Sequence, residues 1–167
     1  MGKSKQIILT HEAIVHKIKR IAYQIYEDNV NEKDLILAGI EGNGLLLAEE
    51  LKIVIEEISG IKVHLCHVQI DKKNPRNQIK TSLPEESYTN KSLVLVDDVL
   101  NSGSTLIYGI KHFLNVPLNQ FKTVVLVNRN HKKYPVKADF KGISLSTSIN
   151  EHVEVVLNKG QFEAYLV

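Results

Sequence analysis

Residues 93–105 read L-V-L-V-D-D-V-L-N-S-G-S-T, an apolar run followed by two acids and a turn of small polar residues. The run from Leu93 to Val96 predicts a strand buried on both faces, because no polar side chain interrupts it. Helices must then cover both faces of the sheet that contains this strand. Asp97 and Asp98 follow directly, and two neighbouring carboxylates repel each other. A purely structural role for both acids is therefore poorly motivated.

The turn from Asn101 to Thr105 predicts an anion-binding site at the start of a helix. Ser102, Ser104 and Thr105 supply hydroxyls, Gly103 permits a tight turn, and the helix N-terminus supplies free N–H groups and a positive dipole end. Carboxylates accept hydrogen bonds from sugar hydroxyls, and each bond to a charged group contributes roughly 1.5–3 kcal/mol. An acceptor for a diol beside a phosphate cradle predicts a ribose 5-phosphate site.

A plainer interpretation is that the two acids end a strand while Asn101 and Ser102 cap the next helix. Short motifs often match by chance, and an arbitrary pair of acids would favour this interpretation. A continuous match over residues 93–105, in a strand–loop–helix context, favours the binding site instead. The Walker loop G-x-x-x-x-G-K-[ST] does not occur in the sequence, and the glycines at 39, 42 and 44 do not fit the dinucleotide spacing G-x-G-x-x-G.

The rest of the chain alternates helical and strand-like segments, which predicts an α/β fold with a mainly parallel sheet flanked by helices. One helix is expected after Thr10, with an apolar stripe at Ile14, Ile18, Ile21, Ala22 and Ile25. Further helices are expected over residues 45–58, ending before Gly60, and from the 101–105 turn to about residue 114. The expected strands are residues 35–40, 61–70, 93–96, 123–127, 153–157 and 162–167.

Length and composition indicate one ordinary domain spanning residues 1–167. The chain is 43% hydrophobic and 24% charged, and its formal net charge of +2 is too small to imply a nucleic-acid or membrane partner. The lone Cys66 cannot form an internal disulfide, which favours a reducing compartment. No apolar run approaches the roughly 18 residues of a membrane-spanning helix, and residues 1–6 contain no signal-peptide core. We therefore expect a cytoplasmic protein.

Residues 71–90 predict a long irregular loop, because their polar side chains follow neither a helical nor a strand period. Loops of this length inside a compact domain are usually functional or mobile. A flexible hood over a ligand site and a plain surface loop are equally consistent with these residues.

Residues 93–105 resemble the phosphoribosyl-pyrophosphate (PRPP) binding motif of type I phosphoribosyltransferases. A second stretch, V-L-V-N-R-N-H-K-K-Y-P-V-K-A-D-F-K-G-I-S-L-S-T-S at residues 125–148, resembles the base-site region of the PyrR family, and residues 8–22 are similar too. Members of that family are pyrimidine-operon attenuators and uracil phosphoribosyltransferases. The resemblance covers nearly the whole chain and is weakest over residues 70–92. It implies the type I phosphoribosyltransferase fold, with a short flexible hood at residues 71–90.

The resemblance implies a role for each part of the site. Asp97 and Asp98 would be the catalytic acids, which hold the ribose hydroxyls and bind Mg²⁺ directly or through water. The implied 5-phosphate site is Asn101, Ser102, Gly103, Ser104 and Thr105, the implied pyrophosphate loop is Glu41, Gly42 and Asn43, and the implied base pocket is Asn128, Arg129 and the backbone of residues 137–140. His131, Lys132 and Lys133 are expected to be solvated surface.

The implied reaction transfers ribose 5-phosphate from PRPP to a ring nitrogen of a nucleobase, uracil by resemblance, and releases pyrophosphate. The transition state should have oxocarbenium character, as in glycoside cleavage, and Mg²⁺ would neutralise the leaving group. The alternative is a non-catalytic regulator of pyrimidine genes that senses nucleotides and binds RNA. Lys17, Lys19 and Arg20 would then contact phosphates, although a solvated helix face is the plainer interpretation of these residues. A homodimer or a larger assembly is implied as well.

Several residues depart from the family pattern, mostly by losing positive charge. In the pyrophosphate loop, Glu41 and Asn43 stand where the family has Lys and Arg. In the phosphate loop, Ser104 replaces an Arg and Asn101 replaces a Tyr; in the hood, Asp71 and Lys72 replace a Tyr-Arg pair. Asn128 replaces an Asp of the base pocket, and Lys19 and Tyr23 replace the Thr and His of RNA-binding members. These changes predict weaker binding of PRPP than of a nucleoside monophosphate. The resemblance also implies a strained cis peptide bond at Ile40–Glu41.

Overall fold

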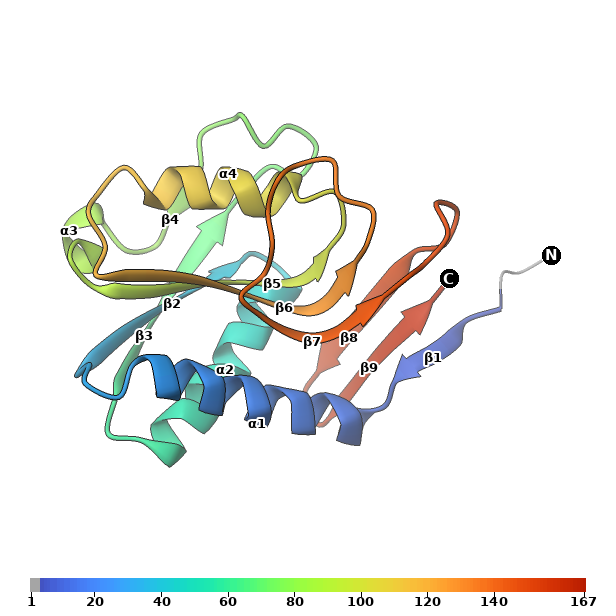
Figure 1. The fold of residues 1–167 in the computed structure, drawn as a ribbon, viewed down its shortest axis with the longest axis horizontal. Helices are drawn as coiled ribbons and strands as arrows, with labels where there is room; N and C mark the ends of the chain where they lie inside the picture. The colour runs from blue at the N-terminus through green and yellow to red at the C-terminus, as the bar shows by residue number, and fades with distance from the viewer. Residues whose placement is uncertain (1–3) are drawn as a thin grey trace.

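The computed structural model describes residues 4–167. The expectation that residues 1–6 lack a signal-peptide core falls partly on Met1, Gly2 and Lys3, which lie outside the described residues. Its main sheet has six strands in the order β4-β3-β2-β5-β6-β7 (Figure 1). β2 (Asp34–Ile40), β3 (Lys62–Gln69), β5 (Ser92–Leu100), β6 (Gln120–Arg129) and β7 (Phe140–Leu145) are parallel, and the short β4 (Lys80–Thr81) is antiparallel to β3. The predicted α/β fold with a mainly parallel sheet is confirmed.

Helices cover both faces of this sheet, as the apolar strands require. α1 (His11–Asp28) and α2 (Asn43–Ile58) lie on one face, and α3 (Glu85–Tyr88) and α4 (Ser104–Phe113) lie on the other (Figure 1). Alternate residues of β2 enter different cores: Leu35 and Leu37 pack with α1 and α2, whereas Ile36 and Ala38 pack on the side of α4. Since successive side chains of a strand point to opposite faces, the two layers of helices follow from the sequence of the strands.

A second, antiparallel sheet extends the α1 layer. Its order is β1 (Gln6–Leu9), β9 (Gln161–Leu166) and β8 (Val153–Asn158), and Figure 1 shows it beside the end of the main sheet with both chain ends. Val155, Leu157 and Phe162 of this sheet are buried in the same core as α1. This packing brings β8 close to the tip of β5, where the acid pair lies.

The irregular segment after β3 is shorter than the predicted loop of residues 71–90. Within it, the longest stretch without a strand or helix is residues 71–79, which we call the hood segment; β4 then pairs with β3, and α3 follows after residues 82–84. Tyr88 is buried and packs edge-on against Phe113, with ring centroids 5.2 Å apart. Because residues 80–90 are mostly polar, the sequence did not indicate that Tyr88 would be buried.

Two other short strands, β1 and β7, were not predicted. In β7 the sequence F-K-G-I-S-L carries Gly142, which reads as a turn residue. A Cβ at this position would lie 2.4 Å from the carbonyl oxygen of Leu126, so glycine allows β7 to approach β6. Arg20 of α1 then donates hydrogen bonds to the carbonyls of Lys141 and Gly142 at 3.1 and 2.9 Å, which fixes the helix over this edge.

Two isoleucines of α2 test which face of the helix is buried. Ile55 is fully buried and Ile53 is 54% exposed. Replacing each by alanine changes helix propensity equally, so any difference in stability between the two variants reports the packing of Ile55 in the core. Ile55→Ala should lower the free energy of unfolding by about 2–5 kcal/mol, whereas Ile53→Ala should change it by less than about 0.5 kcal/mol. Urea denaturation measures both. Equal effects of the two substitutions would contradict the observed orientation of α2.

Candidate active site

The carboxyl end of β5 carries Asp97 and Asp98 into a cleft of about 230 Å³. The cleft is lined by Lys72, Asp97, Asp98, Val99, Leu100, the turn of residues 101–105, Leu106, Val125 and Val153. The structure therefore brings both predicted catalytic acids and the whole predicted phosphate turn to one place. Ligands of open parallel sheets bind at such an edge, beyond the carboxyl ends of the strands.

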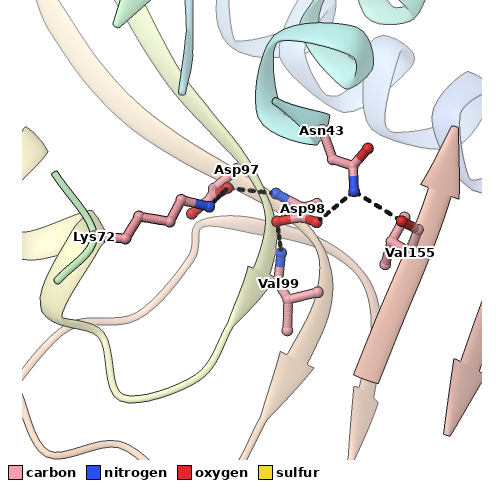
Figure 2. Close-up of polar contacts among 6 residues, drawn as sticks. All are labelled: Asn43, Lys72, Asp97, Asp98, Val99 and Val155. Atoms are coloured by element: carbon pink, nitrogen blue, oxygen red, sulfur yellow. Dashed lines mark hydrogen bonds and ion pairs between the residues drawn. The ribbon is translucent and has the colours of Figure 1, made fainter. Parts of the chain in front are cut away.

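Asp97 is the more buried of the two acids, at 5% exposure. Burial, and next the negative charge of Asp98, raise the pKa of the Asp97 carboxyl from its ordinary value of 3.8 to about 7, while Lys72 acts in the opposite direction. The ammonium of Lys72 lies 3.9 Å from Asp97 Oδ1 (Figure 2). A bound cation near Asp97 would favour the charged form of its carboxyl and lower this pKa. The acid is thus poised to change its protonation when a ligand arrives.

Asp98 is held by hydrogen bonds on the side of α2 (Figure 2). Asn43 Nδ2 donates to Asp98 Oδ2 at 3.0 Å and to the carbonyl oxygen of Val155 at 2.8 Å. The backbone N–H of Val99 donates to Asp98 Oδ1 at 2.8 Å. Asn43, predicted as a pyrophosphate contact, therefore joins the glycine turn, the acid pair and the second sheet, a role that the sequence did not suggest.

The glycine turn before α2 packs directly against the acid pair. A Cβ on Gly44 would lie 2.7 Å from the carbonyl oxygen of Val96 and 3.2 Å from Asp97 Cα, so only glycine permits this approach. Gly42 has φ 95° and ψ −134°, which reverses the chain before the helix begins at Asn43. The prediction of a cis peptide at Ile40–Glu41 is wrong, since residues 4–167 contain no cis peptide bond. The positive φ of Gly42 makes the turn instead.

The turn of residues 101–105 leads from β5 into the N-terminus of α4. Gly103 adopts the left-handed conformation with φ 86° and precedes the first residue of α4. A Cβ there would lie 2.5 Å from Val136 Cγ1. The carbonyl of Ser102 accepts hydrogen bonds from the backbone N–H groups of Lys133 and Tyr134 at 2.8 and 3.1 Å, which fixes the turn against the loop after β6. The N-terminus of α4 is thereby presented to the cleft.

Arg129 and Asn128 do not line this cleft. Arg129 is 5% exposed and donates to Asn101 Oδ1 at 2.9 Å, and its other hydrogen bonds go to Thr147 Oγ1 and to the carbonyls of Ser148 and Glu151. Its guanidinium therefore fastens the loop before β8 to the phosphate turn. Asn128 donates to Ser144 Oγ at 3.2 Å. The predicted base-pocket residues Asn128 and Arg129 thus lie outside the cleft that holds the acid pair.

Glu41 also lies outside the cleft. It is exposed and lines a separate hollow of about 340 Å³ together with His67, Gln69 and Lys80. The expected repulsion between Glu41 and a bound pyrophosphate therefore depends on that group reaching the second hollow. Lys72 of the hood segment does line the cleft, although a lysine in a polar loop gives no pattern by which sequence alone could place it there.

Known proteins share the sequence pattern and the fold of this chain. Residues 4–159 match the phosphoribosyl transferase domain. The chain belongs to the phosphoribosyltransferase family. It is 33% identical to the bifunctional protein PyrR of Fusobacterium nucleatum, over 95% of this chain and 94% of that protein. It is 35% identical to the bifunctional protein PyrR of Listeria welshimeri, over 92% of this chain and 90% of that protein.

Solved structures show the same fold for this phosphoribosyltransferase. The hypoxanthine phosphoribosyltransferase of Trypanosoma cruzi superposes with a TM-score of 0.76 at 20% identity, over 89% of this chain and 84% of that chain. The family match and the PyrR relatives confirm the resemblance that the sequence shows.

No helix within residues 4–167 is both long enough and apolar enough to cross a membrane.

The acid pair offers two carboxylates of the kind that hold Mg²⁺. Mg²⁺ is usually held by one or two carboxylates together with water and substrate phosphates. Within residues 4–167 no cluster of three or more His, Cys, Asp and Glu side chains could hold a metal by itself. Lys72, 3.9 Å from Asp97 Oδ1, provides a positive charge at the same carboxylate. Asp97 and Asp98 would thus supply the protein's share of the ligands.

The raised pKa of Asp97 predicts a pH-dependent loss of stability. Because its folded-state pKa of about 7 exceeds the ordinary 3.8, the folded state binds the proton more tightly. Below about pH 4 both states are protonated and Asp97 costs nothing, whereas the penalty grows as pH rises towards 7 and is constant above it.

Asp97→Asn removes this penalty and should be more stable than wild type at pH 8 by about 4 kcal/mol, because each unit of the shift from 3.8 to about 7 is worth about 1.4 kcal/mol. At pH 4 the two proteins should be nearly equal. Urea denaturation across this range measures the difference. A difference that does not change with pH would contradict the raised pKa.

Proposed function

We propose that the cleft binds the ribose 5-phosphate part of PRPP and that the chain transfers it to uracil. One observation carries this proposal: Asp97, Asp98 and the turn of residues 101–105 line a single cleft at the end of β5. Two carboxylates suit the 2- and 3-hydroxyls of a ribose, and a helix N-terminus suits its 5-phosphate. The relatives named above and the family match support the same chemistry.

In the proposed reaction a ring nitrogen of the base forms a bond to the anomeric carbon of PRPP. The bond from that carbon to the pyrophosphate oxygen breaks, and the base loses its N–H proton to solvent. Mg²⁺, when bound, neutralises charge on the leaving pyrophosphate. Asp97 and Asp98 orient the sugar through its hydroxyls, and their negative charge stabilises the oxocarbenium-like carbon.

Asn43 and the hood segment support this chemistry from opposite sides of the acid pair (Figure 2). Asn43 fixes one oxygen of Asp98, so the carboxylate is oriented before a ligand binds. Lys72 carries a positive charge 3.9 Å from Asp97, where a polyanionic substrate would pass. In our proposal Lys72 supplies part of the charge that the glycine turn lacks.

A regulator that binds RNA is the second candidate function. The relatives are named bifunctional protein PyrR, which supports a second function beside catalysis. The basic residues of α1 support it weakly, because Arg20 is engaged with the carbonyls of Lys141 and Gly142. Lys17 and Lys19 remain as phosphate contacts, which would give affinity without sequence specificity.

Turnover separates the two candidates. PRPP, Mg²⁺ and a panel of nucleobases are incubated with the protein, and release of pyrophosphate is measured. Transfer to uracil in preference to other bases is the expected result. No turnover with any base, together with binding of a nucleoside monophosphate and of pyrimidine-operon RNA, would overturn the enzymatic proposal in favour of the regulator.

Asp98→Asn tests the proposed contact with the ribose hydroxyls. Loss of one charged acceptor should weaken binding of uridine 5′-monophosphate and of PRPP by about 1.5–3 kcal/mol, measured by calorimetry with Mg²⁺. Asp28→Asn, at the exposed end of α1, is the matched control and should bind like wild type. An Asp98→Asn protein that binds both ligands as tightly as wild type would remove the diol role.

A further inference from the structure

Another hollow lies between α4 and the hood segment, distinct from the one beside Glu41, and it is larger than the substrate cleft. Its volume is about 520 Å³, and its walls are residues 75–79 of the hood segment, Glu85, and four residues of α4 and the loop that follows: Tyr108, Lys111, His112 and Asn115. It shares no lining residue with the cleft. Pockets for small organic ligands have volumes of roughly 300–1,000 Å³, so this hollow is large enough for one.

The charged groups of this hollow favour an anion. Arg76 from the hood segment and Lys111 from α4 line it with positive charge, and Glu85 is the one acid among the lining residues. Arg76 presents a planar fork of donors that matches phosphate oxygens, and Lys111 adds a compact positive charge. The side-chain amides of Asn77 and Gln78 line the same wall and can donate further hydrogen bonds.

His112 adds a polar group that the protein leaves unsatisfied. Its Nε2 is buried and has no hydrogen-bond partner among residues 4–167. Burial lowers the pKa of the imidazole, which is therefore neutral at neutral pH and has one donor and one acceptor nitrogen. His112 lines the hollow, so a ligand there that reaches this nitrogen supplies the hydrogen-bond partner that the protein lacks.

Tyr108 gives the hollow an aromatic wall. Its ring packs edge-on against the ring of Tyr134, with centroids 6.3 Å apart, which helps to hold it in place. An aromatic face held in this way suits a planar heterocycle. The hollow thus combines a ring-binding surface with phosphate-binding groups.

We propose that this hollow is a nucleotide-binding site, separate from the substrate cleft. The phosphates contact Arg76 and Lys111, the base packs on Tyr108, and His112 hydrogen-bonds the ligand. Every one of these groups lines the same hollow.

The hood segment connects this hollow to the substrate cleft. Asp71 organises the segment: its carboxylate accepts hydrogen bonds from the backbone of Lys73 and Asn74 and from the side chain of Asn77. Asn77 lines the nucleotide hollow, and Lys72 in the same turn lies beside Asp97. The nucleotide hollow and the substrate cleft are thus lined by neighbouring parts of one hydrogen-bonded segment.

The experiment is an NMR titration of the full-length protein with ATP in the absence of Mg²⁺. The backbone resonances of Tyr108, Lys111 and His112 should shift in a saturable way, and Lys111→Ala or His112→Ala should weaken this binding by roughly tenfold, equivalent to one good hydrogen bond. Lys159→Ala, in the exposed turn between β8 and β9, is the control and should have no effect. Inorganic pyrophosphate is the probe that lacks a ring.

Three results would overturn the proposal. No shift at α4 would show that the hollow does not bind ATP, and shifts that survive both substitutions would place the ligand elsewhere. Equal affinity for pyrophosphate and ATP would make the hollow a simple anion site rather than a nucleotide site. Each readout comes from α4 and is independent of catalysis, so failure of the uracil assay leaves this test intact.

Discussion

The side-chain amide of Asn43 joins three parts of the chain that are remote in sequence. It begins α2, donates to Asp98 at the tip of β5, and donates to the carbonyl of Val155 in the second sheet. The close approach of Gly44 to the backbone of Val96 and Asp97 makes this contact geometrically possible. Together these contacts fix the glycine turn, the acid pair and β8 relative to one another, and the cleft is the space that remains between them and the phosphate turn.

The same arrangement has an energetic cost. Burying Asp97 next to Asp98 disfavours its ionised form, and the protein offsets this only in part through Lys72. A neutral residue would be more stable in this place, so the acid is better explained by a ligand than by the fold. Active sites commonly trade stability for function in this way. Arg129 shows the opposite case, because its charge is buried but its donors are satisfied by neighbouring oxygens.

The sequence was sufficient to predict the parts of the structure that depend on local pattern. The unbroken apolar runs of β2, β5 and β6 identified buried parallel strands, and Asp97, Asp98 and the 101–105 turn were placed correctly at one strand end. Contacts between distant residues were not predictable. Nothing near Asn43 indicates a partner at Asp98, and nothing near Arg129 indicates its hydrogen bond to Asn101. The predicted cis peptide failed because the positive φ of Gly42 already makes the turn.

A crystal structure of the protein with uridine 5′-monophosphate and Mg²⁺ would test the central claim most directly. The account predicts that the phosphate accepts hydrogen bonds from backbone N–H groups of residues 103–105, and that the ribose hydroxyls lie within hydrogen-bond distance of Asp97 or Asp98. A nucleotide whose phosphate binds instead in the hollow beside Glu41, His67 and Lys80, with the acid pair still in contact with Lys72, would contradict it.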